Sequence, residues 1–265
     1  MTSAPIRIGI GGWTFEPWRG TFYPQGLSHK KELEFASRAL SAIEINGTYY
    51  SGFKPATFEG WAKTVPDGFV FTVKGSRFVT NRKVLAEAGE SVARFLGQGI
   101  TELGDRLGPV FWQFMATKKF DPVDFQAFVD LLPASQDGVK LRHAIQVRHE
   151  SFAVPEFVAM CREAGVAIVY ADSPQYPAIA DVTGDFVYTR LEAGEDDNPL
   201  CYPEADFPRW TEAAKSWSAG GVPAGLPYVT PEAPPVTPRE TFIFFIHGGK
   251  VRAPAAAQEL ARRLA

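Results

Sequence analysis

Charged side chains recur at the ends of short apolar runs along this chain of 265 residues. Glu44, Lys74 and Asp172 lie near the ends of three such runs, and Arg148 and Arg190 end two more. Carboxylates can exchange protons with a substrate, and cations can hold an anionic group. Closed parallel barrels bring the ends of their strands to one mouth, so residues far apart in the chain could share a site.

The apolar runs have the length of β-strands, and helical patterns separate them. We expect strands at residues 6–10, 42–46, 69–74, 110–114, 144–148, 167–172, 186–190 and 241–247. Apolar residues recur at helical spacing within 30–40, 92–103, 123–132, 155–164, 207–217 and 255–264. Strands that alternate with helices predict βαβ units and a parallel sheet.

Two segments depart from this alternation. Residues 176–184 are too few for a full outer helix, so we expect one turn there or none. Residues 219–239 are rich in Pro and Gly and cannot form a helix. We expect them to form a long loop before the last strand, where a loop of this length could carry functional groups.

The alternation of side chains within the strands favours a closed barrel. Successive strand residues face opposite sides, so Ile43 and Ile45 share one face while Glu44 and Asn46 share the other. The same pattern places further polar residues on the side opposite their apolar neighbours: Lys74, Arg148, Asp172 and His247. An open doubly wound sheet gives no reason for this repetition, so we predict a single (β/α)8 TIM-barrel-like domain over residues 1–265.

Three residues are the predicted catalytic groups: Glu44, Asp172 and His149. Glu44 would be a general base or an orienting carboxylate, or else a structural ion-pair partner of Lys74. Asp172 would have the same role, or would cap a turn or orient Arg148. His149 follows Arg148 on the opposite face, and its imidazole titrates near neutrality. It could turn into the mouth or bond to a neighbouring loop.

Cations from three separate strands are the predicted anion-binding groups. Lys74, Arg148 and Arg190 exceed the carboxylates Glu44 and Asp172 by one positive charge. A phosphate, a carboxylate or a phosphorylated sugar would complete the balance, because guanidinium groups bind such anions through two hydrogen bonds. The alternative is a network that is neutralised internally, with water.

Amide and aromatic side chains complete the predicted binding site. Three amides near strand ends would bind hydroxyl or carbonyl groups: Asn46, Gln113 and Gln146. Trp13 and Tyr49 belong to aromatic loops, where they could stack on a sugar or a base or could simply pack. His247 precedes two glycines and is a further candidate.

Composition and motifs restrict the function classes. Hydrophobic residues make up 45% of the chain, and the formal charge of −3 provides no general basic surface for nucleic acid. No apolar run is long enough for a membrane span, and the two cysteines lack zinc-ligand spacing. We therefore expect a cytoplasmic protein without a metal or a cofactor.

Five motifs taken together resemble the YecE-like family, a domain family of unknown function. They are GWTFEPWRGTFYP (12–24), EINGTYY (44–50), KGSRFVT (74–80), QVRHESF (146–152) and YADSPQYP (170–177). The resemblance runs over essentially the whole chain and implies a TIM-barrel-like fold, but it supplies no substrate. Gln146 stands where the family usually has Glu, and Asn81 stands where His is common. The ending FFIHGGKVRAP (244–254) replaces one rich in asparagine. If the usual Glu and His form an acid/base pair, this chain lacks both.

The leading hypothesis is a barrel enzyme that acts on a small polar compound, anionic or carbohydrate-like, at the mouth. Hydrolysis, isomerisation and lyase chemistry are not distinguished by these residues. The alternative is a non-catalytic protein that binds nucleic acid or a metabolite through the aromatic mouth.

Overall fold

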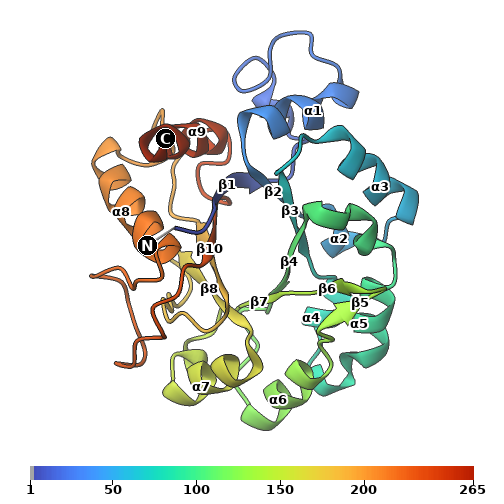
Figure 1. Ribbon diagram of the computed structural model, residues 1–265, viewed down its shortest axis with the longest axis vertical. Coiled ribbons are helices and arrows are strands. Elements are labelled where there is room, and N and C mark those ends of the chain that lie inside the picture. Colours follow the sequence, from blue (N-terminus) through green and yellow to red (C-terminus); the bar gives the residue numbers. More distant parts are fainter. Residues whose placement is uncertain (1–2) are drawn as a thin grey trace.

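The computed structural model describes residues 3–265 and contains a closed barrel of parallel strands (Figure 1). Around the barrel the strands follow the order β1-β10-β9-β8-β7-β4-β3-β2. Their bounds are β1 Ile6–Gly11, β2 Ala42–Ile45, β3 Val70–Lys74, β4 Leu107–Gln113, β7 His143–Gln146, β8 Ala167–Asp172, β9 Phe186–Leu191 and β10 Glu240–Phe245. The predicted TIM-barrel-like fold is confirmed. The first and last strands pair with each other, so both ends of the chain contribute to the closure.

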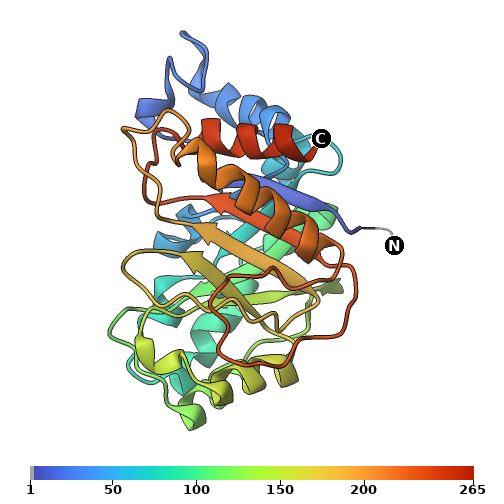
Figure 2. The ribbon, with the colours of Figure 1, turned by 90° about the vertical axis from the view of Figure 1, so that its left-hand side faces the viewer.

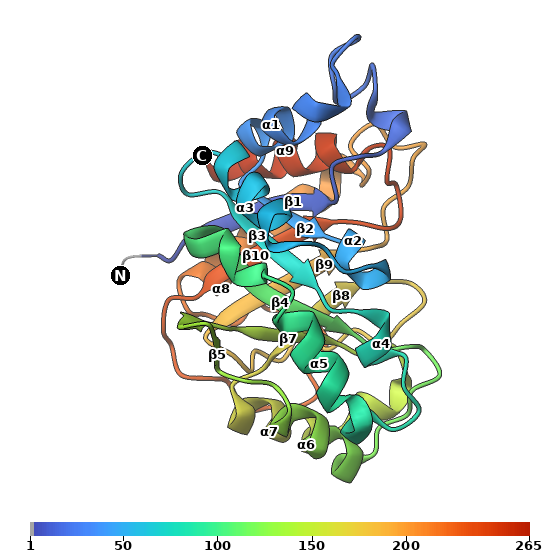
Figure 3. The ribbon, with the colours of Figure 1, turned by 90° about the vertical axis from the view of Figure 1, so that its right-hand side faces the viewer.

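Helices surround the barrel on its outside (Figures 2 and 3). The longer ones are α1 His29–Ala39, α3 Pro55–Thr64, α5 Gly89–Leu96, α6 Pro122–Asp130, α7 Pro155–Ala164, α8 Phe207–Ser218 and α9 Ala253–Leu264. Two short helices, α2 Gly47–Tyr50 and α4 Arg77–Thr80, follow β2 and β3 directly. A small hairpin, β5 Ser135–Gln136 with β6 Val139–Lys140, lies outside the barrel. Within residues 3–265, no helix has the length and apolarity that a membrane crossing needs.

The helices differ from the expectation in two places. The pattern over 92–103 is divided, because α5 ends at Leu96 and a 3-10 segment begins at Ile100. Gly97 caps the end of α5, and Gly99, with a φ of 105°, directly precedes the 3-10 segment. Helix α3 was not predicted, since it buries only Phe58 and carries a weak apolar pattern. Between β8 and β9 the described chain has no helix, as expected.

Side chains inside the barrel form a packed layer that is separate from the layer under the helices. The interior cluster consists of Ala42, Val70, Phe111, Ala144, Ala167, Val169, Phe186, Tyr188, Phe242 and Phe244. Tyr188 stacks on Phe111 with ring centroids 5.4 Å apart. This layer closes the barrel below its mouth, so that the side chains nearer the strand ends rest on an aromatic floor.

Glycine is required where β1 and β2 approach each other. A Cβ on Gly9 would lie 2.0 Å from the carbonyl oxygen of Ala42, which is far closer than atoms can pack. Gly9 therefore permits close contact between the backbones of the two strands.

The segment 219–239 is a loop, as expected, and it lies outside the mouth. The buried carboxylate of Asp181 accepts hydrogen bonds from Val229 N at 2.7 Å, Thr230 N at 3.1 Å and Thr230 Oγ1 at 2.6 Å. The loop therefore packs on the segment that takes the place of the missing helix between β8 and β9 (Figure 2). None of its residues lines the cavity described below.

Candidate functional site

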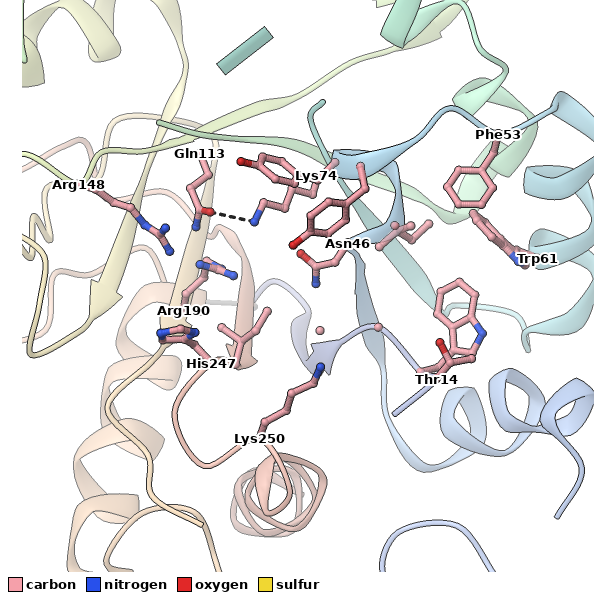
Figure 4. Close-up of a pocket in the computed structure, with 18 residues that line it drawn as sticks. Thr14, Asn46, Phe53, Trp61, Lys74, Gln113, Arg148, Arg190, His247 and Lys250 are labelled. Atoms are coloured by element: carbon pink, nitrogen blue, oxygen red, sulfur yellow. Dashed lines mark hydrogen bonds between the residues drawn. The ribbon is translucent and has the colours of Figure 1, made fainter. Parts of the chain in front are cut away.

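A cavity of about 680 Å³ opens at the carboxyl ends of the barrel strands (Figure 4). This is the end at which TIM-barrel proteins bind their ligands. Most of the predicted site residues line it: Trp13, Asn46, Tyr49, Lys74, Gln113, Arg148, Arg190 and His247. They come from strands or loops that are distant in the chain, so the structure does bring these side chains to one opening.

The lining of this cavity is basic. Lys74, Arg148, Arg190, His247 and Lys250 all contribute to it. Among the described residues, no Asp or Glu is part of the lining. A concave surface that carries one sign of charge concentrates ligands of the opposite sign.

Arg190 is held from below by two buried carboxylates. Glu44 Oε2 accepts from Arg190 Nε and Glu44 Oε1 accepts from Nη2, both at 3.2 Å. Glu192 forms a second ion pair with Nη1. Burial alone would lower the pKa of Arg190, but Glu44 and Glu192 outweigh this effect and raise that pKa. Arg190 therefore remains charged and fixed in direction.

Glu44 does not line the cavity. Its carboxylate is fully buried, and besides Arg190 it accepts a hydrogen bond from Tyr188 Oη at 2.7 Å. The alternative partner considered for Glu44, Lys74, forms no ion pair with any residue of 3–265. Glu44 thus orients Arg190 rather than contacting a ligand directly.

A row of hydrogen bonds joins the cavity to the buried layer. Lys74 Nζ donates to Gln113 Oε1 at 2.8 Å, and Gln113 Nε2 donates to Gln146 Oε1 at 2.8 Å. Gln146 Nε2 in turn donates to Glu192 Oε1 at 3.1 Å. Gln146 is fully buried and also accepts from Arg190, so it supports the site from beneath. Gln113 presents its oxygen to the lysine, and the amide cannot turn without breaking both bonds.

Lys74 has an unusual acid–base character for a lysine. Burial, followed by the positive charge of Arg190, lowers its pKa to about 7. Arg148 adds to this effect, while the carboxylates Glu44 and Glu192 oppose it. Near neutral pH a substantial part of Lys74 is therefore a free amine. Its Nζ lies 4.6 Å from the centre of the Tyr49 ring.

Arg148 presents an unpaired guanidinium group. It lies over the ring of Tyr176, 4.3 Å from the centroid, and forms no hydrogen bond or ion pair with the part of the chain that the structure describes. Its Nε is buried without a partner. Burial lowers the pKa of Arg148, and Glu192 acts in the opposite direction. Buried donors normally have acceptors, so this side chain is prepared for a ligand that supplies them.

The loop after β10 adds two further basic groups. Lys250 Nζ lies 4.1 Å from the centre of the Phe15 ring, and burial lowers its pKa. His247 has a φ of 75°, which residues other than glycine rarely adopt. Strained backbone of this kind is often found at functional sites.

The aromatic residues divide between packing and lining. Trp13 lines the cavity and packs edge-on against Trp61, with centroids 5.1 Å apart. Tyr49 also lines it, and its hydroxyl bonds to Asn81. Trp18 is buried and donates to the carbonyl of Lys250 at 2.8 Å, so it closes the loop as a packing residue.

None of the three predicted catalytic residues lines the cavity: Glu44 lies beneath it, and Asp172 and His149 lie outside it. Asp172 faces outward, where Tyr202 Oη, from the loop before α8, donates to its Oδ2 at 3.1 Å, and burial raises its pKa. Its predicted position inside the mouth is wrong, because β8 turns Ala167 and Val169 inward and so directs Asp172 outward. His149 Nδ1 accepts from Ser151 N at 3.1 Å and caps the following turn. The prediction that it could turn into the mouth is also wrong.

Sequence reasoning missed Glu192, Tyr188 and Lys250. Glu192 lies two positions after Arg190 and hence on the same strand face, which was a usable signal. Tyr188 precedes Arg190 by two positions on that face. Lys250 had no such signal, because it lies in an irregular loop.

The carboxylates and imidazoles among the predicted site residues do not converge on one point. Glu44 is below the cavity, while Asp172 and His149 are outside it, and only His247 is part of its lining. Within residues 3–265, no three His, Cys, Asp or Glu side chains are grouped so as to hold a metal ion.

The chain matches a family model described as protein of unknown function DUF72 over residues 7–265. A search of curated protein sequences finds none that matches. A solved DUF72 family protein from Thermotoga maritima is 23% identical, with a TM-score of 0.74 over 98% of this chain and 99% of that one. One from Enterococcus faecalis is 18% identical, with a TM-score of 0.69 over 99% of both chains.

A structure named SacUVDE is 10% identical, with a TM-score of 0.56 over 98% of both chains. At such identities these structures show the likeness of the fold alone. The family model, in contrast, spans nearly the whole chain. The chain therefore belongs to the DUF72 family of proteins of unknown function, the YecE-like family that its motifs resemble.

Proposed function

We propose that the cavity binds a small anionic compound, phosphorylated or carboxylated and sugar-like in polarity, and that the protein is an enzyme acting on it. The observation that carries this proposal is the lining, which is basic and contains no carboxylate among the described residues. A ligand that brings negative charge would give the unpaired donors of Arg148 their acceptors.

The balance of charge supports an anion. Glu44 and Glu192 face Arg190, so this buried group alone carries one excess negative charge. The positive charge of Arg148 offsets that negative charge. When Lys74 is protonated, the site therefore carries one net positive charge. Lys250, in the loop above, adds to the attraction. Because Lys74 has a pKa of about 7, a bound anion would favour its protonated form and would draw a proton into the site.

The roles of the residues follow from where they lie. Arg148 would hold the anionic group, while Arg190 would be a second, rigid donor whose direction Glu44 sets. Trp13 and Tyr49 would pack against the carbon skeleton of the ligand, as aromatic rings do in sugar sites.

A thermal-shift comparison of matched ligands tests the proposal. Glycerol phosphate should raise the Tm of the protein, and glucose phosphate should do the same, while glycerol and glucose should not. A ligand at about a hundred times its Kd adds about 2.7 kcal/mol of stability, which is readily measured. Equal Tm values with the charged and neutral members of each pair would overturn the proposal.

Single-stranded nucleic acid provides the competing outcome. Its binding to a basic, aromatic surface would weaken steeply as salt is added, because counterions are released on binding. Tight, salt-sensitive binding of an oligonucleotide, with no response to the small phosphates, would favour the non-catalytic alternative.

A further inference from the structure

We infer that Lys74 is a nucleophile that forms an imine with the carbonyl group of a small phosphorylated ketone or aldehyde bound in the cavity. This inference rests on the proposed function, because the phosphate would be held by the basic lining. It goes further by naming the reacting atom and the chemical class of the substrate.

The position of Lys74 is the first support. The residue ends β3 on the interior face of the barrel, and its side chain points into the cavity (Figure 4). Its Nζ has one hydrogen-bond acceptor within residues 3–265, the amide oxygen of Gln113 at 2.8 Å. No described carboxylate forms an ion pair with it. An amine held by a neutral acceptor can lose its proton and keep its place.

The surroundings of Lys74 supply the second support. A lysine attacks a carbonyl only as the neutral amine, which an ordinary lysine seldom provides at pH 7. The pKa of Lys74 is lowered to about 7 by burial and by Arg190. Relative to an ordinary lysine, the neutral fraction at pH 7 is then larger by roughly a thousandfold.

The neighbouring cations supply the third support. Arg148 and Arg190 are both close enough to affect the pKa of Lys74, and both line the same cavity. A phosphate held by the free guanidinium of Arg148 would place the rest of a small molecule within the cavity that Lys74 also lines. The ring of Tyr49 covers Nζ and shields it from solvent.

The chemical step is balanced without an oxidant or reductant. The lone pair of Nζ forms a bond to the carbonyl carbon, while the carbon–oxygen π pair moves to oxygen. A proton passes from nitrogen to that oxygen and gives a carbinolamine. The remaining proton of the nitrogen then passes to the hydroxyl group through solvent, and water leaves as the carbon–nitrogen double bond forms. The products are the imine and one molecule of water.

Reductive trapping in the full-length protein tests this inference. The protein is incubated with dihydroxyacetone phosphate and cyanoborohydride, which donates hydride to an imine and makes the link permanent. Peptide mass mapping should find the adduct at Lys74. In Lys74→Arg the yield of the adduct should fall by at least about tenfold, because a guanidinium does not form an imine. It should persist in Lys63→Arg, a matched control at an exposed lysine on α3.

The pH profile of the wild-type protein provides a readout that does not depend on the folding of a variant. At low concentrations of dihydroxyacetone phosphate, where the free protein predominates, the trapping rate should reach half its maximum near pH 7, where Lys74 of the free protein loses its proton. A rate that continues to rise toward about pH 10 would mean that an ordinary lysine reacts, and would overturn the inference. An adduct located at Lys250, or spread over exposed lysines, would overturn it as well.

Glycerol phosphate separates failure of this inference from failure of the proposed function. It differs from dihydroxyacetone phosphate only in lacking the carbonyl group. If both compounds raise the Tm but no adduct forms, the imine inference fails and the anion site stands. If neither compound binds and no adduct forms, both proposals fail.

Discussion

Glu44 and Arg190 form an ion pair across the interior of the barrel, with two contacts of 3.2 Å between carboxylate and guanidinium. They lie on β2 and β9, which are separated in the sheet by β1 and β10. The pair therefore joins strands that share no backbone hydrogen bonds. It also directs Arg190 toward the cavity that it lines.

Removing the charge of Glu44 should destabilise the protein strongly. Glu44→Gln keeps the shape of the side chain but breaks one of the two ion pairs of Arg190, and it turns an amide NH2 toward donors that a carboxylate oxygen now accepts from. Breaking a buried pair from one side costs about 3–5 kcal/mol, less here because Glu192 remains. The free energy of unfolding from urea denaturation measures the loss.

Glu16→Gln is the matched control for that measurement. The side chain of Glu16 is 76% exposed and lies 3.4 Å from Arg19, so its ion pair should contribute little. Equal unfolding free energies for the two variants would contradict the structural role assigned to Glu44.

Of two adjacent residues, Arg148 should contribute to ligand binding and His149 should not. Arg148→Ala removes a guanidinium that faces the cavity, whereas His149→Ala removes a cap outside it. A hydrogen bond to a charged group is worth about 1.5–3 kcal/mol, so Arg148→Ala should weaken phosphate binding by about ten- to a hundredfold. Calorimetric titration with glycerol phosphate measures the affinity of each variant. A larger loss of affinity in His149→Ala than in Arg148→Ala would refute the assignment.

Lys74 should make the stability of the protein depend on pH. Its pKa is about 7 in the folded protein, against an ordinary value of 10.5. Between these values the unfolded chain binds a proton that the folded chain does not, so the unfolding free energy rises with pH. Below pH 7 Lys74 is protonated in the folded protein, and its buried charge lowers the unfolding free energy by the full amount.

Lys74→Met removes this dependence. The unfolding free energy of the variant, relative to that of the wild-type protein, should be higher at about pH 6 than at about pH 9. The difference between the two pH values should be on the order of a few kcal/mol. Urea denaturation at both pH values gives the comparison, with Lys63→Met as the exposed control. If the difference in unfolding free energy between wild type and variant stays constant with pH, the pKa of Lys74 is not lowered on folding.

Asp181 should control the long loop without affecting the cavity. Asp181→Ala removes the acceptor of Val229 N, Thr230 N and Thr230 Oγ1. Unpaired donors cost about 1–3 kcal/mol, and the loop 219–239 should become more sensitive to proteolysis. Asp185→Ala, at an exposed position with an ion pair to Lys140, is the control. Affinity for glycerol phosphate should be unchanged in both variants, since neither residue lines the cavity.

The strand-face prediction succeeded where one face of a strand is polar and failed where it is not. On β2, Glu44 alternates with Ile43 and Ile45, so its interior position could be predicted. On β8, every residue from Ala167 to Ala171 is buried and apolar, so the alternation carried no signal. Asp172 was therefore placed in the mouth when it belongs to the face under α8.

The sequence by itself determined the alternation of strands and helices, the family, and most of the polar residues that meet at the strand ends. The alternation and the polar strand ends follow from local periodicity, which each segment carries within itself, and the family follows from the resemblance of the motifs. Tertiary structure decided that Glu44 pairs with Arg190 and not with Lys74, and that Glu192 completes the group. It also decided that Lys74 is buried beside Arg190, and burial together with that positive charge lowers its pKa to about 7. Pairing and burial depend on which side chains the closed barrel brings together, and no single segment contains that information.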